Sequence, residues 1–199
     1  MAEFPLLETE RLVLRAFRTS DAPAVLALFS REAVTSHHNI ALMHDIQSAE
    51  ALVAARRSRF EQGAGIYWAL VHRALVDTVI GSCGCYHPHQ ALRSVEIGYE
   101  LNPDYWRQGI MTEALTAMLK FCYGDRFFFR LNRVQALTEM ENWASIGLLQ
   151  KLGFQEEGIL RAYGWWRGSF QDVRCFSLLR REWLGQRCYP PIEEEVKIV

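Results

Sequence analysis

The sequence predicts a single domain of mixed α and β structure, and two kinds of hydrophobic pattern carry this prediction. Residues 95–101 carry hydrophobic side chains at every second position, which is typical of a strand with one buried face. Residues 110–122 carry them three or four positions apart, which is typical of an amphipathic helix. The chain has 199 residues, a length that suits one well-packed domain and is short for two.

The N-terminal part is expected to contain a strand and two helices. Leu12 and Leu14, flanked by Arg11, Val13 and Arg15, predict the first strand. Residues 19–21 are N-cap candidates before a proline at position 23, so we expect a helix through about Phe29. A second helix is expected from about Ser48 to the glycines at positions 63 and 65.

The remaining elements are predicted from the same two periodicities. Turns are expected at Asp77 and in the Pro88 region, and a helix is expected from Gly109 to about Tyr123, with a shorter one from Trp143 to Lys151. The expected strands, in chain order, are residues 67–72, 79–86, 94–101, 133–138, 154–162 and 173–179.

Composition limits the possible functions and the location of the chain. Residues 1–184 are expected to form the domain, and residues 185–199, with two prolines and three consecutive glutamates, a flexible tail. With 22 basic and 23 acidic residues, the net charge of −1 gives no electrostatic reason to expect direct nucleic-acid binding. No apolar run approaches the roughly 20 residues of a membrane helix, and the N-terminus does not resemble a signal peptide. We therefore expect a cytoplasmic protein.

The cysteines predict neither a disulfide framework nor a metal site. The sequence has five of them, an odd number, scattered along a chain that we expect to be cytoplasmic. Cys83, Cys85, His87 and His89 would share one face of a strand, but same-face neighbours lie about 7 Å apart, too far to surround one zinc ion. We interpret them as two core residues followed by a polar turn.

The junction at residues 102–114 is a candidate anion site. The predicted strand ends at Asn102-Pro103, and the predicted helix begins just after Gly109. The start of a helix has backbone N–H groups without intrahelical partners and the positive end of the macrodipole, so that a phosphate can bind there. Taken alone, this pattern is explained better by an ordinary strand-to-helix connection that contains a glycine.

Five further segments change that balance: Leu7-Glu8-Thr9-Glu10-Arg11-Leu12-Val13-Leu14-Arg15, Glu96-Ile97-Gly98-Tyr99-Glu100-Leu101, Tyr105-Trp106-Arg107-Gln108-Gly109, Asn142-Trp143-Ala144-Ser145 and Lys151-Leu152-Gly153-Phe154. In this order the chain resembles the GNAT superfamily of acyl-CoA N-acyltransferases, and within it the ribosomal-protein N-terminal acetyltransferases (RimJ/RimL-like). The similarity covers about residues 6–184. It implies a mixed sheet of six or seven strands, splayed at its centre and flanked by about four helices. It also implies that acetyl-CoA binds between the strand ending at Leu101 and the strand beginning near Arg133.

The resemblance also implies which residues contact the cosubstrate. Trp106 replaces a residue that is polar or basic in most of the superfamily. Met111 stands where a small residue normally lets the cofactor approach; because a thioether side chain is flexible, we expect the site to be retained. Glu113 could be a functional carboxylate, but at the first turn of the helix we interpret it as a dipole and capping residue. The implied cofactor-binding residues are Tyr99, Glu100, Leu101, Trp106, Arg107, Gln108, Gly109, Ile110, Met111, Thr112, Asn142 and Ser145.

Acetyl transfer to an amine requires a neutral nucleophile, donors for the oxyanion and a proton for the leaving thiolate. Glu96 is the leading candidate base; the alternative is a carboxylate paired with an arginine. Many superfamily members have a tyrosine seven residues after the asparagine that matches Asn142, but here that residue is Leu149. Ser145 is then the best remaining donor, and the alternative is a hydroxyl that caps a helix start. Asn142 could orient the cofactor, cap the helix or do both.

Three functions remain open on the sequence. The first is an acetyl-CoA-dependent N-acetyltransferase acting on a peptide or protein N-terminal amine, and the second is the same chemistry on a small amine. The third is a CoA-binding regulatory module without turnover, suggested by Leu149 and Met111. The resemblance places the acceptor groove between residues 30–62 and 161–172. We expect no metal and no membrane partner, and either a monomer or a homodimer.

Overall fold

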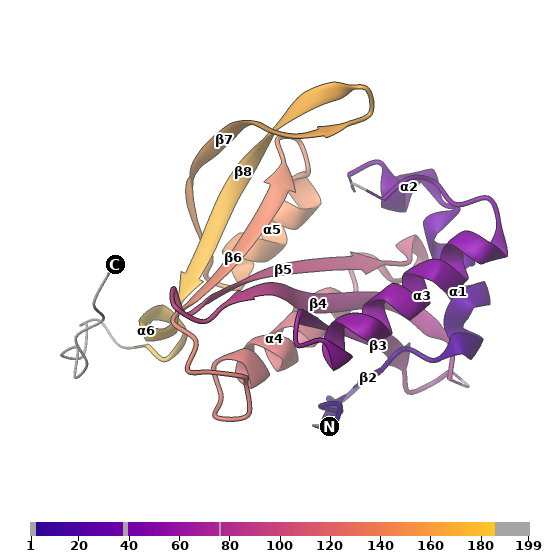
Figure 1. Cartoon of the computed structure of the whole chain (residues 1–199), viewed down its shortest axis with the longest axis horizontal. Helices are drawn as coiled ribbons and strands as arrows, with labels where there is room; N and C mark the ends of the chain where they lie inside the picture. Colours follow the sequence, from indigo (N-terminus) through magenta and orange to yellow (C-terminus); the bar gives the residue numbers. More distant parts are fainter. Residues whose placement is uncertain (1–2, 38–39, 76, 186–199) are drawn as a thin grey trace.

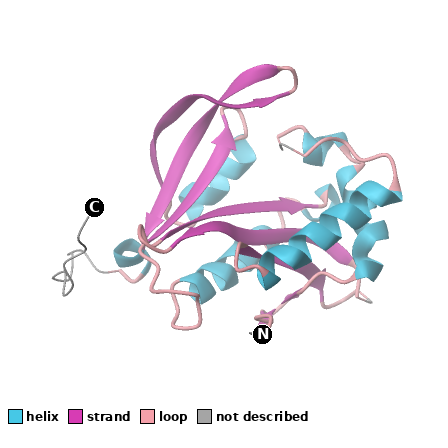
Figure 2. Ribbon diagram, in the orientation of Figure 1, coloured by secondary structure: helices cyan, strands magenta, loops and turns pink. Residues whose placement is uncertain are grey.

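In the computed structural model, which describes residues 3–37, 40–75 and 77–185, eight strands form one sheet (Figures 1 and 2). Their order in the sheet is β1-β2-β3-β4-β5-β6-β8-β7. The strands are β1 (Leu7–Glu8), β2 (Leu12–Arg15), β3 (Gly65–His72), β4 (Val79–His89), β5 (Ser94–Leu101), β6 (Arg133–Glu139), β7 (Gln155–Trp166) and β8 (Ser169–Leu179). The helices are α1 (Ala22–Phe29), α2 (Glu32–Thr35), α3 (Ile46–Glu61), α4 (Ile110–Cys122), α5 (Trp143–Lys151) and α6 (Arg180–Trp183), with short 3₁₀ turns η1 (Thr19–Asp21) and η2 (Pro103–Tyr105).

The sheet opens into a V between β5 and β6, its parallel pair (Figure 1). Pairing covers four residue pairs, from Ser94 with Arg133 to Ile97 with Ala136. Beyond these pairs each strand continues along its other neighbour, β5 along β4 and β6 along β8. Among the described residues, 98–101 of β5 and 137–139 of β6 therefore have no partner strand on the side that faces the V.

Two hydrophobic cores cover the two faces of the sheet. On one face, α4 and α5 pack on the strands around Trp68, Ile97 and Leu115, all nearly inaccessible to solvent. On the other face, α1 and α3 enclose a smaller core around Phe29 and Val71. Because β5 lies between these layers, its odd-numbered side chains face α4 and α5, and Glu96 and Glu100 face the opposite side.

The mixed α/β class and the order of the main elements confirm the prediction from the sequence, and the structure corrects several details. The Pro88 region is not a turn: β4 continues through His89, with a bulge between Tyr86 and His89, and the chain turns at residues 90–93. The long β7–β8 hairpin extends beyond both predicted strands. Eight strands and six helices replace the expected six or seven and four, because the short β1, α2 and α6 lack a periodic signal.

The expected flexible tail lies almost wholly outside the described residues, which end at position 185. Within the described part of the chain, no helix is both long enough and apolar enough to cross a membrane.

Candidate active site

The β5–α4 turn, residues 102–109, connects one arm of the V to helix α4. At its start, the side chain of Asn102 accepts a hydrogen bond from the N–H of Asp104. The indole of Trp106 donates to the carbonyl of Leu101 over 2.8 Å and so folds the turn back onto the end of β5. Arg107 and Gly109 have φ angles of 58° and 73°, and Gly109 occupies the N-cap position of α4. Left-handed residues of this kind aim successive backbone N–H groups at one point, which suits an anion.

Glu113 holds this turn from the side, and its carboxylate is paired with the Arg11 guanidinium. Its carboxylate accepts hydrogen bonds from the Thr9 hydroxyl and from the backbone and side chain of Arg11, and the Arg11 guanidinium also donates to the carbonyl of Gln108. Burial disfavours the ionised carboxylate, but these hydrogen bonds outweigh burial and lower the pKa of Glu113. Glu113 thus lies in the first turn of α4, as predicted, but its side chain clamps the N-terminal segment to the turn instead of capping the helix.

Met111 does not block the start of α4. Its side chain is 8 % exposed and belongs to the core beneath the helix, as does that of its neighbour Ile110. The backbone of both residues, and of Thr112, remains in the first turn, where N–H groups have no intrahelical partner.

On β5, the three residues expected to bind the cosubstrate have different environments. The Tyr99 hydroxyl lies 2.7 Å from the Ser145 hydroxyl of α5, so this contact links the two arms of the V. Leu101 is in the core. The Glu100 carboxylate is buried on the opposite face, 2.7 Å from the Arg56 guanidinium and hydrogen-bonded to Ser82. Glu100 therefore presents only its backbone to the V.

Helix α5 carries the other predicted polar residues. The Asn142 side chain caps the helix by accepting a hydrogen bond from the N–H of Ser145 over 3.1 Å. Leu149 is fully buried, so the position where many relatives carry a tyrosine belongs to the core. Ser145 is therefore held at two points, through its N–H by Asn142 and through its hydroxyl by Tyr99.

Glu96 lies near the vertex of the V, on the face opposite α4. Its side chain is 25 % exposed, and Oε1 lies 3.5 Å from His87 Nδ1. The bulge of β4 gives His87 a φ of 51° and turns its ring toward this carboxylate. Burial raises the pKa of Tyr163 on β7, and the nearby charge of Glu96 raises it further. Among the residues that the structure describes, no ion pair joins Glu96 to an arginine, and its carboxylate lies beside a histidine and a tyrosine.

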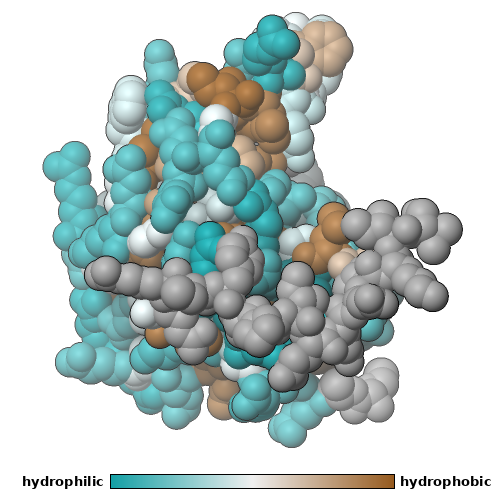
Figure 3. Space-filling view, turned by 90° about the vertical axis from the view of Figure 1, so that its left-hand side faces the viewer, coloured by the Kyte–Doolittle hydropathy of each residue, from teal (hydrophilic) through white to brown (hydrophobic). Residues whose placement is uncertain are grey.

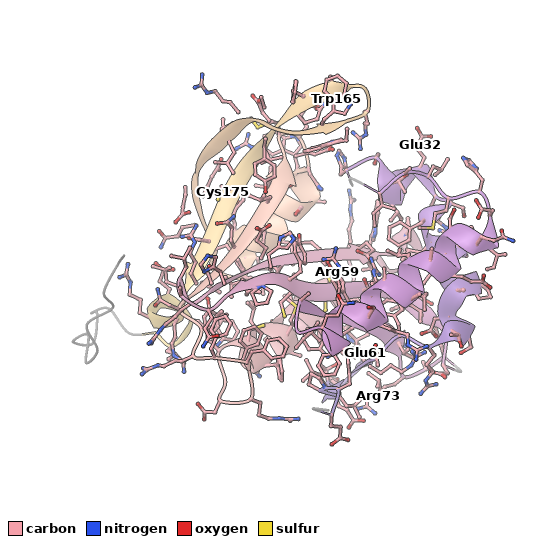
Figure 4. All side chains as sticks on the ribbon, in the orientation of Figure 1. Glu32, Arg59, Glu61, Arg73, Trp165 and Cys175 are labelled. Atoms are coloured by element: carbon pink, nitrogen blue, oxygen red, sulfur yellow. The ribbon has the colours of Figure 1, made fainter. Side chains whose placement is uncertain are left out.

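The tip of the β7–β8 hairpin is fastened to the α2 segment by contacts that we call the hairpin strap. The Arg167 guanidinium donates to the carbonyls of Thr35 and Ser36 and lies 3.3 Å from the Glu139 carboxylate. Glu139 also accepts a hydrogen bond from the Trp166 indole and contacts His37 Nδ1 at 3.1 Å. In Figure 4, Trp165 near the hairpin tip and Glu32 on α2 lie at the same end of the molecule.

Sequence reasoning missed the strap and the Tyr99 hydroxyl. The sequence carries only a weak indication that Arg167 matters, because it lies in the aromatic, glycine-containing segment 163–170. Nothing in the local sequence links it to residues 35 and 36. Tyr99 carried a stronger signal, because the strand register directs it to the same side as Val95 and Ile97, toward α4 and α5.

The cysteine–histidine cluster does not form a metal site. Cys83 and Cys85 are fully buried in the core, while His87 is exposed. Among the described residues, no group of three or more His, Cys, Asp or Glu side chains is placed to hold a metal ion.

Comparison with known proteins identifies the same fold and chemistry. The family model of the acetyltransferase (GNAT) domain matches residues 11–155. The chain is 33 % identical over 177 residues to the uncharacterized N-acetyltransferase YoaA of Bacillus subtilis, covering 89 % of this chain and 98 % of YoaA. It is 35 % identical over 179 residues to the uncharacterized N-acetyltransferase p20 of Bacillus licheniformis, covering 90 % and 98 %. A shorter match, 29 % identical over 91 residues, links 46 % of the chain to 45 % of the ribosomal protein uS5-alanine N-acetyltransferase of Escherichia coli.

Solved structures extend the comparison to bound CoA. RimJ of Mycobacterium smegmatis in complex with CoA-disulfide is 25 % identical, with a TM-score of 0.73 over 84 % of this chain and 81 % of RimJ. The acetyltransferase of Salmonella typhimurium that modifies the N-terminal serine of ribosomal protein L7/L12 shares the fold, with a TM-score of 0.77 at 19 % identity, over 88 % of this chain and 99 % of that one.

Proposed function

Because the chain belongs to the GNAT acetyltransferase family, we propose that it moves the acetyl group of acetyl-CoA to the α-amine at the N-terminus of a protein. Family membership establishes acetyltransferase activity with acetyl-CoA as the donor. The identity of the acceptor is our proposal. It is supported by the similarity to an enzyme named for acetylating alanine of ribosomal protein uS5. Acceptors of this kind are made in the cytoplasm, and we place the reaction there.

The V between β5 and β6, with the β5–α4 turn at its end, is the observation that carries the proposal. The unpaired edge of residues 98–101 offers backbone groups to an extended ligand such as the pantetheine arm. The backbone N–H groups of residues 108–112 would hold the pyrophosphate at the start of α4. A Cβ atom built on Gly109 would meet only the Arg11 guanidinium, at 3.6 Å, so the turn leaves room for a ligand.

The positions of Glu96 and Ser145 support a role for both side chains in direct transfer. Glu96 is partly desolvated and faces away from α4, so it would take the proton from the attacking amine, directly or through water. Ser145 lies across the V on α5 and would donate to the sulfur of the leaving group. The oxyanion would be stabilised by a backbone N–H of residues 99–101. No step uses a cysteine nucleophile.

A polypeptide acceptor is favoured over a small amine by the surface beside Glu96. Tyr163 of β7 lies near this carboxylate, and the hairpin that continues from it exposes large apolar side chains. Figure 3 shows brown surface in the upper part of the molecule, where the hairpin lies. A peptide whose N-terminal amine reached Glu96 could bury some of these side chains, whereas a small amine would leave them exposed. They are Ile159, Leu160, Tyr163, Trp165 and Phe170.

Thiol release from acetyl-CoA with matched acceptors tests the proposal. The panel pairs short peptides bearing a free N-terminal serine or alanine with the same peptides blocked at the N-terminus, and adds amino-acid amides and polyamines. We expect thiol release with the free peptides only, and a mass increase of one acetyl group at their α-amine. Turnover of the small amines alone would overturn the choice of acceptor.

Thermal stabilisation is the accompanying control, since a ligand that binds only the folded state raises the melting temperature. Stabilisation by acetyl-CoA without thiol release for any acceptor would identify a regulatory module instead of an enzyme. No stabilisation at saturating acetyl-CoA would contradict the proposed site itself.

A further inference from the structure

The hydroxyl pair of Tyr99 and Ser145 has a geometry that goes beyond a structural contact. The two oxygens are 2.7 Å apart and come from opposite arms of the V, Tyr99 from the part of β5 beyond its last pair with β6 and Ser145 from the first turn of α5. Among the described residues, the Ser145 hydroxyl has no other hydrogen-bond partner. Its second hydrogen-bonding direction is therefore available to a ligand in the V.

The phenol of Tyr99 is able to donate in this contact. Burial raises the pKa of Tyr99 to about 12, although the hydrogen bond with Ser145 acts in the opposite direction. The phenol is therefore protonated at neutral pH and able to donate. A serine hydroxyl has one proton and two acceptor lone pairs. If the phenol donates to Ser145, the serine oxygen is the acceptor in that contact, so the serine proton must point elsewhere. The backbone N–H of Ser145 is held separately by Asn142.

We propose that Tyr99 is a positioning residue that turns the Ser145 hydroxyl proton into the V, so that the serine donates a hydrogen bond to the sulfur of CoA. This inference rests on the proposed acetyltransferase function and assigns the Tyr99 side chain a role beyond the cofactor contact implied by the sequence.

The reaction balances without a change of protonation at either hydroxyl. The amine nitrogen forms a bond to the acetyl carbon, and when the tetrahedral intermediate collapses, the C–S bond breaks and its electron pair remains on sulfur. The thiolate is stabilised by the hydrogen bond from Ser145 and later takes a proton from water, while the proton of the amine leaves through Glu96. A proton relay from Tyr99 is unfavourable, because its phenol holds the proton more tightly than an alkyl thiol, with a pKa of about 8.5.

The direct test is the ionisation of CoA bound to the protein, followed through the ultraviolet absorbance of the thiolate. A hydrogen bond to the charged form lowers a pKa. We expect the thiol pKa of bound CoA to lie about one unit below that of free CoA, and Ser145→Ala to abolish this difference. An unchanged thiol pKa in the wild-type complex would overturn the inference without reference to any variant.

Tyr99→Phe isolates the positioning role. We expect the thiol pKa to rise toward that of free CoA and kcat to fall about 10-fold, with an unchanged Kd for CoA. In the Ser145→Ala background the same substitution should have no further effect on either quantity, because Tyr99 acts through Ser145. Additive effects of the two substitutions would contradict the proposal and indicate that Tyr99 acts separately from Ser145.

Tyr123→Phe is the matched control. Tyr123 is a second buried tyrosine, and its hydroxyl donates to the carbonyl of Leu178, away from the V. We expect this variant to lower the melting temperature and to leave the thiol pKa and kcat unchanged.

The outcomes also separate the two proposals. Failure to bind CoA or to release thiol would refute the proposed function, whereas normal turnover with an unperturbed thiol pKa would refute only the role of Tyr99.

Discussion

The β5–α4 turn and the hairpin strap lie on different sides of the V and are held in different ways. The turn takes its shape from neighbours in sequence, such as the Trp106 indole on the carbonyl of Leu101 and the left-handed Gly109, whereas its clamp to Arg11 is distant in sequence. The strap joins Arg167 to carbonyls 131 and 132 residues earlier in the chain. Contacts so distant in sequence form only when the intervening chain has folded. Much of the shape of the proposed cosubstrate side is thus encoded locally, whereas its clamp through Glu113 and the proposed acceptor side depend on the completed fold.

Substitution of Glu96, near the vertex of the V, should have the largest effect and touch neither region. We expect Glu96→Gln to lower kcat/KM about 100-fold at pH values where the acceptor amine is protonated, because the proton then lacks an acceptor. The loss should shrink as pH rises and the amine becomes neutral. The pH dependence of this loss is measured by steady-state kinetics, and the Kd for acetyl-CoA is the control. An equal loss at every pH would exclude Glu96 as the base.

Gly109→Val should disrupt the turn alone. A β-branched residue at a φ of 73° is strained, and left-handed backbone costs about 1–2 kcal/mol even for an ordinary residue. We expect the Kd for acetyl-CoA, measured by calorimetry, to increase at least roughly 10-fold. Gly109→Asn should weaken acetyl-CoA binding much less, because asparagine tolerates this backbone conformation.

Gly168→Val applies the same backbone strain beside the hairpin strap, because Gly168 has a φ of 74° in the turn between β7 and β8. It should leave the Kd for acetyl-CoA unchanged. Equal weakening of acetyl-CoA binding by the two valine variants would show that the regions are not independent.

Arg167→Ala should release the strap. The partly exposed ion pair with Glu139 contributes little, but the guanidinium also holds two backbone carbonyls, so we expect about a three- to five-fold rise in the acceptor KM. The KM for acetyl-CoA should not change. Arg161→Ala, at an exposed arginine of the same hairpin, is the control for loss of charge. A shift in both KM values would contradict the separation of the two regions.

The smallest effect is expected at Glu157, which pairs with Arg133 beside the vertex of the V. The hydrogen bond from Arg133 lowers the pKa of Glu157 to about 2, although burial opposes this shift. A lowered folded-state pKa stabilises the protein above the unfolded value near 4.3, and this contribution disappears as pH falls toward about 2. Because the pair is partly exposed, we expect less than about 1 kcal/mol.

Melting curves of the wild type and Glu157→Gln between neutral and acidic pH check this prediction. The difference in melting temperature should be constant near neutrality and should vanish in acid. A difference that grew as pH fell would have the wrong sign for a carboxylate with a lowered pKa.

The sequence predicted most of the fold because its main elements have periodic hydrophobic patterns. It missed β1, α2 and α6, each four residues or fewer, since so short a segment contains too little periodicity. Pro88 was misread as a turn because a bulge accommodates it within β4. In the site, the turn was predicted from Gly109 and the strand end, but Arg167 required knowledge of what lies opposite the hairpin. Met111 seemed unfavourable for cofactor binding only because its burial beneath α4 could not be inferred.

The V also has a mechanical consequence. The central joint between its arms is the four residue pairs of β5 and β6, and the Tyr99–Ser145 hydrogen bond crosses the gap beyond them. A ligand lying in the gap would bond to both halves of the sheet and act as a removable cross-link. Amide hydrogen exchange at residues 98–101 and 137–139 should therefore slow together when CoA binds, and the two halves should then unfold as one cooperative unit.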